Sequence, residues 1–181
     1  TFLKANTNTV WNSAFVYAGV EGQLRDYIHW DATGDYVFLG SQMNDLSVKA
    51  NARLDLYPFR RARKSPVSLN VHFETSLEEP EYYYQHYYSN HYKWDNDFGK
   101  ISTTKIQGSL NIPRWRIGAR VGYALLSGNV YYDSTGVVRQ NNSPMSVLSA
   151  SLDKNFALGP VHLDNRLLFQ ISSDDEVLPL P

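Results

Sequence analysis

Apolar and polar residues alternate without a break through residues 46–58 of the chain. The apolar set is Leu46, Val48, Ala50, Ala52, Leu54 and Leu56, and the polar set is Ser47, Lys49, Asn51, Arg53, Asp55 and Tyr57. Successive side chains of an extended strand point to opposite faces, so the pattern predicts a strand with two unlike faces. A helix would scatter the charged residues around its circumference, so only a period of two explains the pattern.

The same alternation predicts further strands along the chain. We expect strands over residues 10–22, 67–77, 105–112, 115–125, 145–156 and 161–171, and a short extended segment at 36–41. The facing of the first strand is ambiguous, and we expect residues 23–35 to form a polar loop. Strands without an intervening helical pattern predict an antiparallel all-β fold.

The predicted connections alternate in length. Sharp turns fall at residues 113–114 and 158–160, whereas polar connections at 78–99 and 127–144 are long. The basic connection PFRRARKSP has prolines at both ends, which block further ladder pairing. Outer-membrane barrels combine short periplasmic turns with long external loops, and a soluble sandwich does not need that asymmetry.

We therefore predict an antiparallel up-and-down transmembrane β-barrel, or part of one, with residues 1–181 as a single region. A soluble β-sandwich that acts as a binding module is the alternative fold, since its strands would show the same alternation. A membrane barrel would instead place one face of each strand in lipid and the other around a lumen.

The composition of the chain limits which classes of partner we expect. The chain has 181 residues, of which 43% are hydrophobic, and it lacks the run of about eighteen apolar residues that a transmembrane helix needs. Its 17 basic and 18 acidic residues create no overall field that would attract nucleic acid, so we expect no nucleic-acid partner. The absence of cysteine excludes disulfides and thiolate metal sites.

In a barrel, the polar strand face would line a lumen. The charged and histidine side chains of that face are Lys49, Arg53, Asp55, His72, Glu74, Lys105, Arg116, Arg120, Asp153, His162, Asp164 and Arg166. Basic groups outnumber acidic ones in this set, which predicts a modest preference for anions. The alternative is that these side chains form opposite-charge pairs along the lumen wall, which would leave no such preference.

The long connection at residues 78–99 is rich in aromatic residues: Tyr82, Tyr83, Tyr84, Tyr87, Tyr88, Tyr92 and Trp94. Rings with a polar tip suit the membrane–water boundary, so we expect an interfacial girdle and a packed loop root. A surface that stacks sugar rings or binds a protein is the alternative.

Catalytic and metal chemistry find little support. The spacing of His86, His91, Asp95 and Asp97 fits no compact zinc motif, so we expect no metal. The chain has neither a Gly-x-Ser-x-Gly elbow nor a glycine-rich phosphate loop, so we expect no enzyme activity and no cofactor.

The segments EEPEYYYQHYYSNHYKWDNDFGK, GSLNIPRWRIGARVGYALL and SVLSASLDKNFALGPVHLDNRLLFQ resemble the putative porin family of Bacteroidota outer membranes. The resemblance extends from about residue 23 onward. It implies an outer-membrane β-barrel with a passive transport role and carries no catalytic motif. Family members look longer and the chain ends in EVLPLP rather than in an aromatic residue, so we expect a fragment that lacks strands at both ends.

From these observations we predict an outer-membrane porin that lets small polar solutes diffuse passively, with outer-membrane lipid around it. The alternative is a non-conducting outer-membrane barrel whose aromatic external loop binds a glycan or a partner protein. An eight-stranded barrel would be of this second kind, because side chains fill its interior. Other envelope proteins and further copies of the chain stay open as partners.

Overall fold

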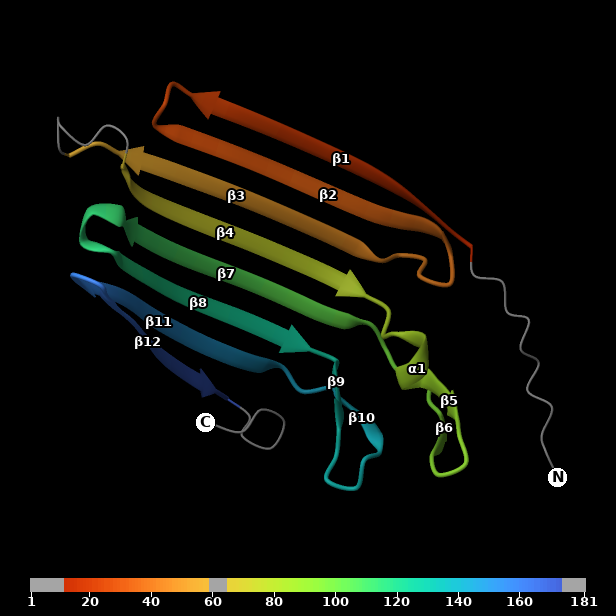
Figure 1. The fold of residues 1–181 in the computed structure, drawn as a ribbon. Helices are drawn as coiled ribbons and strands as arrows, with labels where there is room; N and C mark the ends of the chain where they lie inside the picture. The colour runs from red at the N-terminus through yellow and green to blue at the C-terminus, as the bar shows by residue number, and fades with distance from the viewer. Residues whose placement is uncertain (1–11, 59–64, 174–181) are drawn as a thin grey trace.

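The computed structural model describes residues 12–58 and 65–173. Eight strands form one antiparallel sheet in which each strand hydrogen-bonds to the next along the chain (Figure 1). They are β1 (Ser13–Leu24), β2 (Ile28–Gly40), β3 (Leu46–Leu56), β4 (Val67–Glu78), β7 (Ile101–Ile112), β8 (Ile117–Ser127), β11 (Met145–Leu158) and β12 (Val161–Ser172). The predicted antiparallel all-β fold is therefore confirmed.

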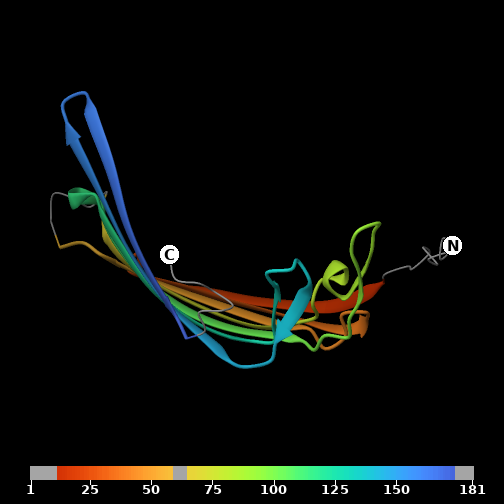
Figure 2. The ribbon, with the colours of Figure 1, turned by 90° about the horizontal axis from the view of Figure 1, so that it is seen from below.

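The sheet is open: we predicted a barrel or part of one, and the described strands do not form a closed barrel. Among the described residues, β1 pairs only with β2 and β12 pairs only with β11. Figure 2 shows a curved trough whose first and last strands stay apart. Closure requires the edge strands to come within the ladder spacing of about 4.8 Å, and the bend of these eight strands is too gentle for that.

The prediction that residues 23–35 form a loop is also wrong, because most of that segment belongs to β2. The period of two continues through it. Trp30 lies opposite Ala52 of β3 in an apolar row, and Asp31 lies opposite Asn51 in the neighbouring polar row. The loop is reduced to a tight turn between β1 and β2.

Both long connections carry secondary structure of their own. The first contains α1 (Tyr82–Gln85), β5 (His86–Tyr88) and β6 (Lys93–Asp95), and the second contains β9 (Asn129–Tyr132) and β10 (Val138–Asn141). The two resulting hairpins rise from the same end of the sheet on its concave side (Figure 2). In the described part of the chain, no helix is long and apolar enough to cross a membrane.

Short turns gather at the opposite end of the sheet. The β7–β8 turn is the 3₁₀ helix η1 (Pro113–Trp115), so Trp115 lies in a turn rather than in the predicted strand. The β11–β12 turn contains Gly159 at φ +61°, a conformation that favours glycine. Most of the basic connection between β3 and β4 lies at residues 59–64, outside the described residues.

The strand register sorts side chains into continuous rows. One apolar row runs through Ala50, Phe73, Ile106, Tyr123, Leu148 and Ile171. The adjacent polar row begins with Lys49, Glu74 and Lys105. Since directly opposed residues share a face, the sheet has one apolar face and one largely polar face.

Exposure is inverted relative to a water-soluble sheet. On the apolar face Val121 is 57% exposed and Leu167 is 69% exposed, whereas on the polar face Asp55 and Ser68 are only 5% and 6% exposed. Side chains crowd together on the concave side of a curved sheet and spread apart on the convex side. The polar face is therefore the concave one, and of the described hydrophobic residues only Val138 and Met145 are buried.

Candidate functional site: the concave polar face

The concave face carries the predicted polar side chains on adjacent strands. The strand residues of that set that share it are Lys49, Arg53, Asp55, His72, Glu74, Lys105, Arg120, Asp153, His162, Asp164 and Arg166. Arg116 departs from the prediction of a strand position, because it lies in the turn after η1 at φ 51°. That these residues line a lumen stays a prediction, since the sheet is open.

Glu74 is the centre of a charged cluster in the middle of the face. Its Oε1 lies 3.2 Å from Nζ of Lys49, and its Oε2 lies 3.7 Å from Nζ of Lys105 and 3.8 Å from Nε2 of His72. Lys49 and Lys105 reach it from both sides because they stand directly opposite it on the neighbouring strands. One carboxylate is thus shared by two ammonium groups.

Asp55 forms a second cluster near the short-turn end of β3. Ser68 donates a hydrogen bond to its Oδ1 at 2.5 Å, and Nε of Arg53 donates to the same oxygen at 2.9 Å. His29 of β2 lies 4.0 Å away through Nε2. The nearly buried carboxylate is satisfied by groups from three strands, which fixes their relative register.

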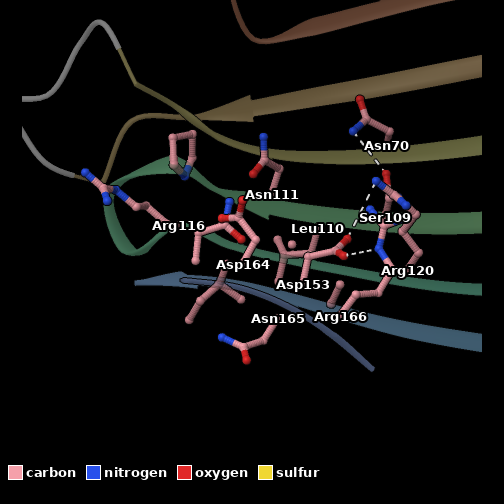
Figure 3. Close-up of a pocket in the computed structure, with 15 residues that line it drawn as sticks. Asn70, Ser109, Leu110, Asn111, Arg116, Arg120, Asp153, Asp164, Asn165 and Arg166 are labelled. Atoms are coloured by element: carbon pink, nitrogen blue, oxygen red, sulfur yellow. Dashed lines mark hydrogen bonds and ion pairs between the residues drawn. The ribbon is translucent and has the colours of Figure 1, made fainter. Parts of the chain in front are cut away.

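Asp153 is shared by two arginines on the strands that flank β11. Nε of Arg166 donates to Oδ1 of Asp153 at 2.5 Å, and Nη2 of Arg120 lies 3.8 Å from its Oδ2 (Figure 3). These residues line a groove of about 800 Å³ on the concave face. Opposite-charge pairs therefore form on this face at Glu74, Asp55 and Asp153, as the alternative to unpaired charges expected.

Four acidic strand residues of this face were missed, one of them Glu78 at the end of β4. Asp31 and Asp35 lie in the polar rows of β2, and Glu21 of β1 stands directly opposite Asp31. With them included, Lys and Arg no longer outnumber Asp and Glu on the strands of the face. The residue count therefore no longer supports the sequence-based anion preference, which stays a prediction. The alternation that continues from residue 28 to 36 was the available signal.

The aromatic residues pack mainly against one another at the long-loop end. Tyr87 stacks on Trp94 with ring centroids 4.7 Å apart, and Trp94 lies 6.4 Å from Tyr132 of β9. Tyr84 also packs edge-on against Tyr132, at 5.9 Å. These contacts join the two hairpins, so the predicted packed loop root is present, and Tyr132 is a member that the sequence did not single out.

The remaining aromatic residues surround this cluster. Tyr92 lies 6.4 Å from Trp94, Tyr82 lies 5.8 Å from Tyr83, and Trp94 donates through Nε1 to the carbonyl oxygen of Tyr83 at 2.9 Å. The carboxylate of Asp95 raises the pKa of Tyr88. Their position relative to a membrane boundary stays a prediction.

Two polar side chains fix the long loops to the sheet. Lys100 donates to Asp45 and, at 2.8 Å, to the carbonyl oxygen of Met43, and it lies 3.7 Å from Glu79. The side-chain amide of Gln140 donates to the carbonyl oxygens of Gly99 at 2.7 Å and Gly128 at 2.8 Å. The hairpins are therefore held in place by hydrogen bonds as well as by aromatic packing.

The β9–β10 turn is organised around Asp133. Its carboxylate accepts hydrogen bonds from the hydroxyl of Thr135 at 2.5 Å and from Nε of Arg139 at 2.7 Å. The Thr135 hydroxyl, followed by Arg139, holds the pKa of Asp133 well below its usual range.

The predicted histidine and carboxylate neighbours in the aromatic loop form a simple pair. His86 Nδ1 lies 2.5 Å from Oδ1 of Asp95. Within residues 12–58 and 65–173, no group of three or more His, Asp or Glu side chains gathers in the way that metal ligands do.

Residues 3–181 match a family whose description is "Putative porin". Neither the curated proteins nor the solved structures give a match.

Proposed function

The chain belongs to the putative porin family, as its sequence resemblance predicted, and we propose that it forms part of the wall of an outer-membrane pore for small polar solutes. The observation that carries this proposal is the inverted exposure of the sheet. Its convex face presents Val121, Leu167 and their neighbours outward, whereas its charged side chains are paired on the concave face. Lipid outside and water inside is the arrangement that satisfies both faces.

Strand length supports a membrane-spanning role. A tilted transmembrane strand needs about 9–11 residues. The shortest strands of the sheet, β3 and β8, have 11 residues, and the longest, β11, has 14. We place the two hairpins of the long connections on the external side and the short turns in the periplasm, since barrels are built with that asymmetry.

The openness of the trough supports a wide pore. Eight strands that closed on themselves would leave an interior filled by side chains. In this proposal further strands complete the ring, and the concave face then borders water. Solutes would pass Glu74, Asp55 and Asp153 by diffusion, without a covalent step.

Single-channel conductance of the full-length protein in planar bilayers tests the proposal. We expect ohmic channels, and a silent bilayer that contains correctly inserted protein would overturn it in favour of a non-conducting barrel.

Single cysteines sharpen this test. A cysteine at Asn51, on the concave face, should lose conductance on reaction with a charged methanethiosulfonate. A cysteine at the neighbouring Ala52, on the convex face, should not, because lipid surrounds it in this proposal. Equal responses of Asn51→Cys and Ala52→Cys would contradict the proposed facing.

A further inference from the structure

We propose that the groove over Gly118 on the concave face is a binding site for small hydroxylated monocarboxylates, the chemical class of the sugar acids. This inference rests on the proposed pore, because it places a solute site on the pore wall. It follows from the shape of the groove, from two arginines with unused donors, and from the neutral amides around them.

The groove exists because β8 has almost no side chain at this point. Gly118 stands between Asn111 of β7 and Asp153 of β11 in the polar row. A Cβ atom added at Gly118 would meet only Cβ and Oδ2 of Asp153, both at 3.7 Å, which is ordinary contact. The glycine therefore forms the floor of a hollow between longer neighbours, and its backbone would accept a side chain.

The guanidinium groups of Arg120 and Arg166 border this floor, and most of their N–H donors are not used by Asp153. Arg166 uses Nε to reach Asp153 at 2.5 Å, and Arg120 approaches the same carboxylate only to 3.8 Å. A guanidinium has five N–H donors, so one carboxylate leaves most of these ten groups for a solute. Both side chains are exposed on the concave face (Figure 3). A planar fork of this kind matches a carboxylate in geometry and charge.

The rest of the lining favours hydroxyl groups and a single negative charge. The amides of Asn70 and Asn111 and the hydroxyl of Ser109 line the same groove, and each can both donate and accept hydrogen bonds. Asp153 and Asp164 also line it, against Arg116, Arg120 and Arg166, so the lining carries one net positive charge, which matches a solute with a single negative charge. A carboxylate attached to a polyhydroxyl chain satisfies both parts of this lining.

Binding of D-gluconate to the full-length protein in detergent micelles, measured by calorimetry at low salt, tests the inference. D-Glucitol is the matched neutral probe, since it replaces the carboxylate by a hydroxymethyl group. We expect saturable gluconate binding and at least about tenfold weaker glucitol binding, because a charge-assisted hydrogen bond contributes roughly a factor of ten or more. Equal affinities for the two probes would overturn the inference.

Variants identify the site. Arg120→Gln and Arg166→Gln should each weaken gluconate binding about tenfold, and Arg120→Lys should restore only part of the loss because it keeps the charge but not the fork. Gly118→Leu should abolish binding by filling the floor. Gly108→Leu is the matched control, because Gly108 lies on the convex face with no atom within 4 Å of an added Cβ, and it should bind normally. Normal binding by Gly118→Leu would overturn the proposed location.

Conductance separates this inference from the proposed function. Conducting channels without gluconate binding would overturn only the binding site. Gluconate binding in a protein that gives silent bilayers would overturn only the pore. A folded Gly118→Leu protein can be recognised by an unchanged circular dichroism spectrum, and if it does not fold, the two Arg→Gln variants still decide the question.

Discussion

Lys49 and Glu74 stand directly opposite each other on β3 and β4, with Nζ and Oε1 3.2 Å apart. Lys105 approaches the same carboxylate from β7, so removal of one negative charge leaves two ammonium groups without their partner. We expect Glu74→Gln to lower the free energy of unfolding by about 1 kcal/mol and to shift permeability towards anions. Urea unfolding in lipid vesicles and the reversal potential in a salt gradient measure these effects.

Glu78 provides the control for this prediction. It lies on the same strand and face at the long-loop end, and no ion pair joins it to any described residue. Glu78→Gln should leave the unfolding free energy nearly unchanged. A loss as large as that of Glu74→Gln would show that the central cluster contributes nothing specific.

Which face of the sheet contacts lipid can be tested by introducing an arginine on each face, at neighbouring positions along the strands. Ala52 lies in an apolar row of the convex face, and Gln107 lies in the adjacent polar row of the concave face. In a bilayer, Ala52→Arg should cost about 2–4 kcal/mol near the midplane. Gln107→Arg should cost less than about 1 kcal/mol and change conductance instead. Similar unfolding energies for the two variants would contradict a lipid-facing convex surface.

The Lys100 contacts should stabilise the long-loop end. Its ammonium group reaches Asp45, which is largely buried, together with Glu79 and the carbonyl oxygen of Met43. We expect Lys100→Met to lower the unfolding free energy by about 2 kcal/mol, because it leaves a buried carboxylate without its cation. Adding Asp45→Asn to this variant should recover part of the loss. Additive losses in the double variant would rule out a direct coupling between Lys100 and Asp45.

Tyr132 should couple the two hairpins. Its ring contacts Trp94 and Tyr84, which belong to the other long connection. An aromatic pair contributes about 0.5–1.5 kcal/mol beyond burial. We expect Tyr132→Ala to speed amide hydrogen exchange in β5 and β6 as well as in its own hairpin. Val137→Ala, in the β9–β10 hairpin but outside the ring contacts, should leave exchange in β5 and β6 unchanged.

The β9–β10 turn should resist acid. Because Thr135 and Arg139 lower the pKa of Asp133 in the folded turn, the unfolded turn binds protons more readily as the pH falls. The contribution of Asp133 to stability is therefore complete above the ordinary aspartate range and is lost only as the pH falls through that range towards the lowered pKa. NMR should find the Thr135 amide still ordered at about pH 4, where a free aspartate is half protonated.

An asparagine at position 133 separates this effect from general acid unfolding. Asp133→Asn removes the titrating group, so its turn should be less ordered at neutral pH and should show no further change between neutral and mildly acid pH. A wild-type turn that melts together with an ordinary aspartate titration would contradict the lowered pKa.

Alternation predicted most of the strands because each half-polar strand repeats the same local rule. The segment at residues 46–58 became β3 with nearly the same limits, and its residues keep the predicted faces. The first part of β2 was predicted as a loop because Asp31, Gly34 and Asp35 are poor strand formers, although the period of two continues through them. Here the pairing with β1 and β3 outweighs the local preference.

The site was predictable only as far as side-chain facing. A period of two assigns Lys49 and Glu74 to one side of the sheet. Arg116 does not lie on a strand as predicted, because its own positive φ ends the extended conformation and with it the alternation. The contacts of Trp94 with Tyr132 and of Lys100 with Asp45 join segments far apart in the sequence, which no local pattern places together. Closure was beyond local rules as well, since strands alternate in the same way in open and closed sheets.

Under the proposed function, the outer strands β1 and β12 set the order of assembly in a membrane. Among the described residues, each has a ladder partner on one side only, so its other edge presents backbone N–H and C=O groups that hydrocarbon cannot satisfy. Each such group left unpaired in lipid would cost several kcal/mol, more than a neighbouring apolar side chain gains. Under the proposed function, the convex face can therefore enter the bilayer only when both edges find strand partners, so that insertion and ring completion become one cooperative event.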